Sequence, residues 1–291
     1  MGQVASGSLA WSENRPLRRA ISVSDWGARV RLRYHARMNE HDQPRRQRKG
    51  IYLLPNLFTT GTLFGGFFAI VSAMNGHFSM AAAGILAAMI ADALDGRIAR
   101  LTNTQSDFGK EYDSLCDMVA FGVAASVVMY AFSLHHLADY KWLGGKLGWV
   151  VAFLFTACTA LRLARFNVLA AIAGSNKDFF GLPSPAAAAV ITFFVWTAHS
   201  NGLDGATLLV PATVLTVVIA LLMVSNFRYS SFKQIKLAER VPFFKLLVAV
   251  GLIVLVATNP PLVLFLTFFG YALSAPLAAA WRRYRGRPTA V

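Results

Sequence analysis

The chain has 291 residues, 56% of them hydrophobic and 14% charged, and its mean hydropathy is +0.49. This composition excludes an ordinary soluble domain and predicts a membrane protein with room for several spans. The net charge of +14 does not indicate a nucleic-acid partner. Basic loops on one membrane face account for it, and the basic segments lack a series of aromatic side chains on which bases could stack. Cys116 and Cys158 lie in apolar segments without a nearby Cys or His, so we expect neither a disulfide scaffold nor a zinc site.

Residues 1–50 differ from the rest of the chain, because they are rich in Arg and poor in long apolar runs. They predict a basic cytoplasmic tail that is mobile or interfacial. Residues 26–34 could lie as a basic amphipathic helix on anionic lipid. The segment has no continuous apolar core of a signal peptide, so we expect no cleavage or export of the N-terminus. Met38 is an alternative start of the protein.

Eight apolar stretches approach the roughly twenty residues that cross a bilayer. They predict an all-α fold, a polytopic membrane helix bundle with about eight transmembrane helices within residues 51–285. A short C-terminal tail follows at 286–291. The predicted spans are 53–74, 78–95, 112–133, 147–165, 184–200, 206–226, 243–258 and 260–281.

The distribution of basic residues predicts how these spans are oriented. With eight alternating spans, every Lys and Arg except Lys141 and Lys146 falls on one side of the membrane. That side is expected to be cytoplasmic and to carry both termini, and an odd number of spans would destroy the asymmetry. We therefore expect an integral protein of the inner (cytoplasmic) membrane, with the segment between the second and third spans facing the cytoplasm.

Six of the 14 acidic residues lie within residues 92–117, at the junction of the second and third spans. On helices, Asp92 and Asp95 share one face and Asp113 and Asp117 share another, because residues three or four apart are neighbours on a helix surface. If the two helices are antiparallel neighbours, as a short connection favours, the four carboxylates converge near the membrane surface. Such a group needs compensating positive charge, and its hard oxygen atoms suit Mg²⁺ or Mn²⁺. Four carboxylates can hold two ions, an arrangement that serves phosphoryl transfer.

Small and basic residues surround these acids. Gly96 and Gly109 would leave room for a phosphate or nucleotide to approach the backbone, and Arg100 offers a planar group for phosphate oxygens. Each residue also has a structural explanation: Gly96 could serve only close helix packing, and Arg100 could be a topology charge. Asp107 and Glu111 lie outside the spacing and are expected to be solvated.

The complete spacing is Asp92-x2-Asp95-Gly96-x2-Ala99-Arg100-x8-Gly109-x3-Asp113-x3-Asp117. It resembles the signature of the CDP-alcohol phosphatidyltransferases at every fixed position. Members of this family transfer a phosphatidyl group from CDP-diacylglycerol, or a phosphobase from a CDP-alcohol, to a hydroxyl and release CMP. The resemblance implies that three aspartates bind the metal ions and that a fourth is the general base and also touches the second ion; these are Asp92, Asp95, Asp113 and, as the base, Asp117. It implies nucleotide or diphosphate contacts for Gly96, Ala99, Arg100 and Gly109.

Four further stretches are similar to the integral-membrane bacterial members of this family that use serine as the acceptor. They are LPNLFTTGTLFGGFFAI at 54–70, RLARFN at 162–167, FGLPSPAAA at 180–188 and VSNFRYSSFK at 224–233. This resemblance implies CDP-diacylglycerol and L-serine as substrates. The residues that would hold phosphate or the serine carboxylate are Arg162, Arg165, Asn167, Ser184 and Arg228. The alternatives are topology charges for the arginines and helix capping for the asparagine; Asn56 in the first stretch could likewise cap its helix or contact the nucleotide.

Other functions stay open. A phosphatidyltransferase for another alcohol, such as glycerol 3-phosphate, inositol phosphate or choline, would carry the same signature. Acids within a membrane also occur in divalent-cation transporters, but a transporter would place them near mid-bilayer on several helices, whereas these lie on one helix pair. The family resemblance also implies a homodimer formed through membrane helices. Small residues, namely Gly61, Gly65 and Gly66, would allow close approach of helices that the sequence does not identify.

Overall fold

The computed structural model describes residues 53–102, 106–139, 145–173, 181–227, 229, 251, 255 and 257–285. Four predictions fall wholly or mostly outside these residues: the tail at 1–50, the span at 243–258, the C-terminal tail at 286–291 and the role of Arg228.

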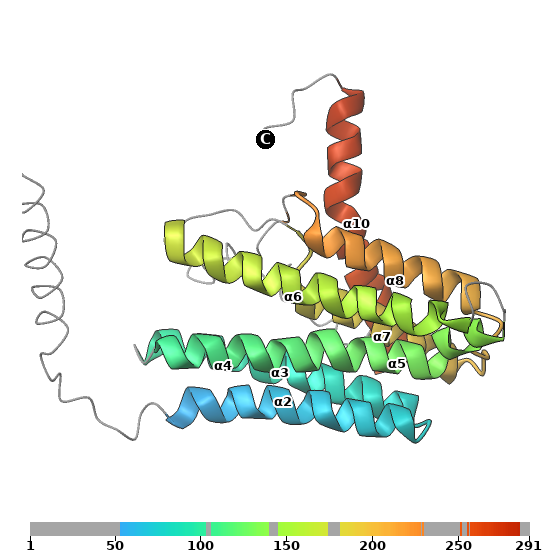
Figure 1. Ribbon diagram of the computed structural model, residues 1–291, viewed down its shortest axis with the longest axis horizontal. Helices are drawn as coiled ribbons and strands as arrows, with labels where there is room; N and C mark the ends of the chain where they lie inside the picture. The colour runs from blue at the N-terminus through green and yellow to red at the C-terminus, as the bar shows by residue number, and fades with distance from the viewer. Residues whose placement is uncertain are drawn as a thin grey trace, which may run out of the picture. The chain divides into compact units, whose positions relative to one another are not determined.

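Every regular element of the described part is a helix (Figure 1). An all-α fold is therefore confirmed for these residues. The helices are α2 (Leu53–Met74), α3 (Phe78–Leu101), α4 (Asp107–Asp117), the π-helix η1 (Met118–Ala124), α5 (Ala125–Phe132), the 3₁₀ helix η2 (Leu134–Ala138), α6 (Leu147–Ala173), α7 (Ser184–Ser200), α8 (Leu209–Val224) and α10 (Pro260–Tyr284).

Five helical segments within the described residues are long and apolar enough to cross a membrane. A sixth apolar helix, Leu209–Val224, is shorter. This result supports the membrane class, whereas the count of eight spans and their orientation stay predictions. The five segments are Asn56–Met74, Phe78–Ala99, Asp107–Phe132, Leu147–Leu169 and Pro260–Arg282.

Glycines on α2 let this helix approach two neighbours closely. A Cβ on Gly65 would lie 2.7 Å from the carbonyl oxygen of Gly84 in α3, and a Cβ on Gly66 would lie 2.5 Å from Cα of Ala120 in η1. Only glycine allows these backbones to come so near, as in other membrane helix pairs. The small residues of α2 therefore form contacts within the chain.

Helix α7 forms the centre of the described bundle. It packs against α3, α5, α8 and α10, and its residues from Ala186 to Phe193 are all buried. In Figure 1, α2, α3 and the α4–α5 segment lie side by side, and α6 lies next to α8. Because successive helices alternate in direction, the C-terminal end of α3 and the N-terminal end of α4 lie at the same end of the bundle.

Candidate active site

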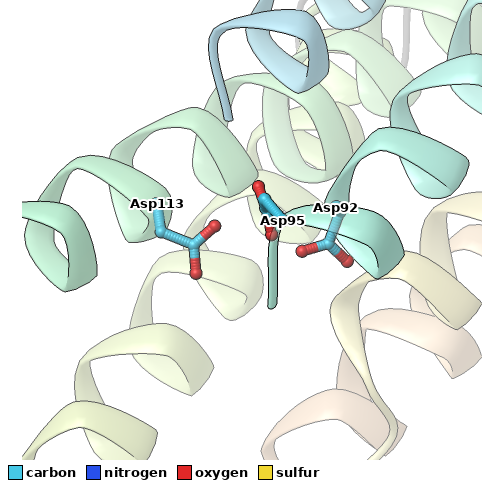
Figure 2. A group of neighbouring side chains, drawn as sticks. All are labelled: Asp92, Asp95 and Asp113. Carbon is cyan, nitrogen blue, oxygen red and sulfur yellow. The ribbon is translucent and has the colours of Figure 1, made fainter. Parts of the chain in front are cut away.

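Three aspartate side chains meet in the space between α3 and α4. Asp92 and Asp95 lie on the C-terminal half of α3 and Asp113 lies on α4. Figure 2 shows their carboxylates directed toward a common space. One oxygen from each carboxylate lies within 4.8 Å of the others. For these three residues, the two helical faces converge as their spacing predicts.

Among the described residues, no basic side chain forms a salt bridge with these carboxylates. Asp95 is 5% exposed, and its Oδ2 accepts a hydrogen bond from the Thr59 hydroxyl of α2 at 3.0 Å. One oxygen of Asp113 and one of Asp117 are buried and accept no hydrogen bond. The salt bridges found among the described residues are formed by Asp107 and Asp139, which lie outside the cluster. Because buried polar atoms are nearly always partnered, a divalent cation is the partner that fits this set of oxygens.

Asp117 lies one helical turn beyond Asp113, at the point where α4 passes into η1. It is outside the set of oxygens within 4.8 Å of one another. Even so, Asp92, Asp113, Asp95 and Arg162 all lie near enough to influence its charge. A π-helical turn is wider than an α-helical one, and such turns are frequent at functional sites. The structure therefore places Asp117 at the edge of the cluster.

The two signature glycines have different surroundings. Within the described residues, a Cβ on Gly96 would meet no atom within 4 Å, so they give no support to close helix packing at this glycine. The backbone N–H of Gly109 donates to the N-cap oxygen of Ser106 at 3.0 Å. A Cβ on Gly109 would lie 3.1 Å from that oxygen and 3.6 Å from Oδ1 of Asn56. Of these two glycines, Gly96 is therefore the one with open space beside it in the described part of the chain.

The remaining signature positions lie on α2 and at the end of α3. Ala99 and Arg100 belong to the last turn of α3, and the Arg100 side chain is outside the described part. Asn56 is the fourth residue of α2, which begins at Leu53. The prediction that Asn56 caps this helix is therefore wrong. Pro55 fits within the first turn of α2, so the proline does not mark the start of the helix. Its carboxamide faces Gly109, and a nucleotide contact stays a prediction.

Arg162 and Ser184, from two of the acceptor stretches, are in direct contact. Ser184 is fully buried at the start of α7, and its hydroxyl accepts a hydrogen bond from Nη1 of Arg162 at 2.7 Å. Nε of Arg162 is buried and has no partner, and Asp117 lies close enough to act on the guanidinium charge. The Nε donor of this buried arginine, which lies near the acidic cluster, therefore has no hydrogen-bond partner.

Arg165 and Asn167 connect helices in the described part. Nη2 of Arg165 donates to Oδ1 of Asn226, just beyond α8, at 2.8 Å. Nδ2 of Asn167 donates to Oγ of Ser114 on α4 at 2.9 Å. Both side chains therefore hold α6 against its neighbours at the end of the bundle that carries the acids.

Two residues near the site had not been predicted. Thr59 contacts Asp95, and Tyr271 of α10 lies close enough to act on the charge of Arg162. Tyr229 packs against the Tyr271 ring with centroids 5.5 Å apart and donates its hydroxyl to the carbonyl of Ala272 at 2.8 Å. Burial raises the pKa of Tyr229 to about 12, so the hydroxyl stays a donor. The sequence stretch at 54–70 contains Thr59. Its hydrogen bond to Asp95 depends on how α2 is shifted along α3, and the spacing of residues in the sequence does not give this shift.

Fold and site together define an integral membrane protein with a carboxylate cluster suited to a divalent cation and to phosphate chemistry. A sequence profile of CDP-alcohol phosphatidyltransferases matches residues 52–224. The chain belongs to the CDP-alcohol phosphatidyltransferase family and is a transferase enzyme. The matched residues include the whole acidic cluster.

Several known proteins that are similar to this chain have names that refer to serine or to a serine lipid. A CDP-diacylglycerol–serine O-phosphatidyltransferase of Helicobacter pylori is 41% identical over 187 residues, which cover 64% of this chain and 75% of that protein. One of Mycobacterium bovis is 41% identical over 149 residues, 49% of each chain. An archaetidylserine synthase of Methanothermobacter thermautotrophicus is 33% identical over 166 residues, which cover 56% of this chain and 66% of that protein.

Proposed function

We propose that this enzyme transfers the phosphatidyl group of CDP-diacylglycerol to the hydroxyl of L-serine, giving phosphatidylserine and CMP. Membership of the family and the names of similar proteins support the reaction. The proposal that a metal ion assists the reaction rests on one observation: Asp92, Asp95 and Asp113 each have an oxygen within 4.8 Å of the others. The buried, unpartnered oxygens of Asp113 and Asp117 add a further requirement for positive charge.

Each residue of the site has a distinct part in this proposal. Asp92, Asp95 and Asp113 would hold Mg²⁺ or Mn²⁺, two ions when Asp117 contributes as well. Bound ions of this kind would neutralise the diphosphate oxygens and stabilise the departing CMP. The space beside Gly96 would admit the diphosphate. Ala99, Arg100 and Gly109 would contact the nucleotide or diphosphate, as the family resemblance implies.

Asp117 would act as the general base, as the family resemblance implies. It takes the proton from the serine hydroxyl while that oxygen bonds to the phosphorus attached to diacylglycerol. The bond between this phosphorus and the oxygen of CMP breaks, and CMP leaves with its own phosphate. The Arg162 guanidinium lies near enough to Asp117 to influence its charge, and its Nε has no partner. This Nε would pair with the serine carboxylate, while Ser184 holds the guanidinium.

We further propose the arrangement of the protein in the cell. Eight spans would place both termini and the active site at the cytoplasmic face of the inner membrane, as the distribution of Lys and Arg predicts. Residues 1–50 would form a basic tail and residues 51–285 the catalytic membrane domain. The enzyme would work as a homodimer. Serine and CMP then exchange with the cytosol while the lipid chains stay in the bilayer.

An acceptor screen tests the reaction. Purified full-length protein in detergent micelles receives CDP-diacylglycerol, Mn²⁺ or Mg²⁺, and one alcohol at a time, and CMP release and labelled phospholipid are measured. We expect CMP only with serine, together with phosphatidylserine. Equal turnover with glycerol 3-phosphate, an inositol phosphate or choline would contradict serine as the acceptor, and no CMP with any alcohol would contradict the transferase reaction.

A further inference from the structure

The hydroxyl of Thr59 makes a polar contact from α2 to the acidic cluster. Thr59 on α2 is 4% exposed and Asp95 on α3 is 5% exposed, so the hydrogen bond between them is shielded from water. Its length of 3.0 Å is within the usual range, and the two residues are 36 positions apart in the sequence. The contact therefore fixes one helix against the other at the cluster.

This hydrogen bond orients the Asp95 carboxylate. Oδ2 accepts from Thr59, which restricts rotation of the carboxylate. One oxygen of this carboxylate lies within 4.8 Å of oxygens of Asp92 and Asp113. A hydroxyl cannot neutralise a carboxylate, so the need for positive charge remains. Carboxylates that bind metals are commonly held by such hydrogen bonds, and removing the partner weakens metal affinity by about 10–100-fold.

The neighbouring residue connects α2 to the second acidic helix. The Thr60 hydroxyl lies 3.0 Å from the hydroxyl of Tyr112 on α4, one residue before Asp113. Adjacent threonines on α2 thus contact α3 and α4, the two helices that carry the acids. Helix α2 has no acidic residue of its own, yet it contacts both sides of the site.

We propose that Thr59 is a positioning residue that sets the divalent-cation affinity of the site by orienting Asp95. The inference rests on the proposed metal-assisted function, but it concerns a residue that is not a ligand. It predicts that losing the hydroxyl weakens cation binding even before any substrate is present.

Thr62 provides a matched control on the same helix. It is 1% exposed, and its hydroxyl approaches only backbone oxygens, those of Phe58 and Ala88, each at 3.4 Å. Replacing either threonine by valine removes one buried hydroxyl at nearly constant volume. Only the change at position 59 removes a contact to a cluster carboxylate.

The test compares Thr59→Val, Thr59→Ser and Thr62→Val in purified full-length protein. Mn²⁺ binding without substrate is followed by electron paramagnetic resonance, and thermal unfolding is recorded for each variant. We expect Thr59→Val to weaken Mn²⁺ binding by about 10–100-fold, and Thr59→Ser and Thr62→Val to bind as the wild type does. The Mn²⁺ concentration for half-maximal CMP release should rise in parallel for Thr59→Val alone.

The possible failures are distinguishable. Unchanged Mn²⁺ binding by Thr59→Val, or an equal loss in Thr62→Val, would overturn the role of Thr59 while wild-type CMP release leaves the proposed function intact. Wild-type protein that binds no Mn²⁺ would overturn the metal site and this inference together.

Discussion

Asp117 differs from the other aspartates of the cluster in its surroundings. Arg162 lies nearby, and the chain turns into a π-helix directly after it. The other three share the space between α3 and α4. A base at the edge of the site can receive a proton from the acceptor while its neighbours hold the cation, which is why we separate the two roles.

Substitution of single aspartates should separate base from ligand. Asp117→Asn removes the base, so kcat should fall by about 10²–10⁴-fold while Mn²⁺ binding at the other three acids persists. Asp95→Asn removes a ligand, so both CMP release and Mn²⁺ binding should be lost. Kinetics and electron paramagnetic resonance on the same preparations measure both quantities.

Asp107 supplies the control for these variants. It is exposed and pairs with Lys110 at 3.1 Å, away from the cluster, and Asp107→Asn should leave turnover and Mn²⁺ binding unchanged. If Asp117→Asn loses Mn²⁺ binding as completely as Asp95→Asn, Asp117 is primarily a ligand and the base must be sought elsewhere.

At the scale of helices, the acids could be predicted from sequence because helical spacing alone puts each pair on one face. Their meeting also needed α3 and α4 to be neighbours, which a short connection favours. The role of α2 was not predictable, since the contact of Thr59 with Asp95 depends on how two apolar helices are shifted along each other.

Asn56 was misjudged because a proline in the first turn conceals where α2 begins. The seven residues of η1 read as an ordinary apolar helix, because a π-turn leaves no distinct pattern in so short a segment.

Glycines on neighbouring helices should respond in opposite ways to alanine. Gly66→Ala would place a Cβ 2.5 Å from Cα of Ala120, and such overpacking should destabilise the protein by about 1–3 kcal/mol. Gly96→Ala meets no atom of the described residues and should leave stability unchanged or raise it by up to about 1 kcal/mol, since alanine favours a helix.

Activity distinguishes the two glycines further. Gly96→Ala fills the space that the diphosphate needs, so it should raise KM for CDP-diacylglycerol although the protein is at least as stable as wild type. Thermal unfolding and substrate kinetics check both variants. Normal kinetics in Gly96→Ala would contradict a ligand beside this residue, and normal stability in Gly66→Ala would contradict the close packing of α2 on η1.

At the scale of the whole molecule, the ends of several helices bring the acidic cluster and basic side chains to the same end of the bundle. The contacts of Arg162 with Ser184, Arg165 with Asn226 and Asn167 with Ser114 all lie at that end, as do the acids. A lipid substrate with a soluble headgroup requires this separation, because its chains stay in hydrocarbon while the diphosphate meets the cation. The α2 glycines contact α3 and η1, so the proposed homodimer would use other surfaces.

The most direct test is whether a cation held by α3 and α4 touches the diphosphate. Full-length protein with Mn²⁺ and CDP-diacylglycerol, in the absence of serine, is studied by electron–nuclear double resonance at phosphorus. The wild type should show phosphorus coupled to bound Mn²⁺, and Asp113→Asn should lose the coupling. Bound Mn²⁺ without phosphorus coupling, in protein that still releases CMP when serine is added, would contradict the proposed site.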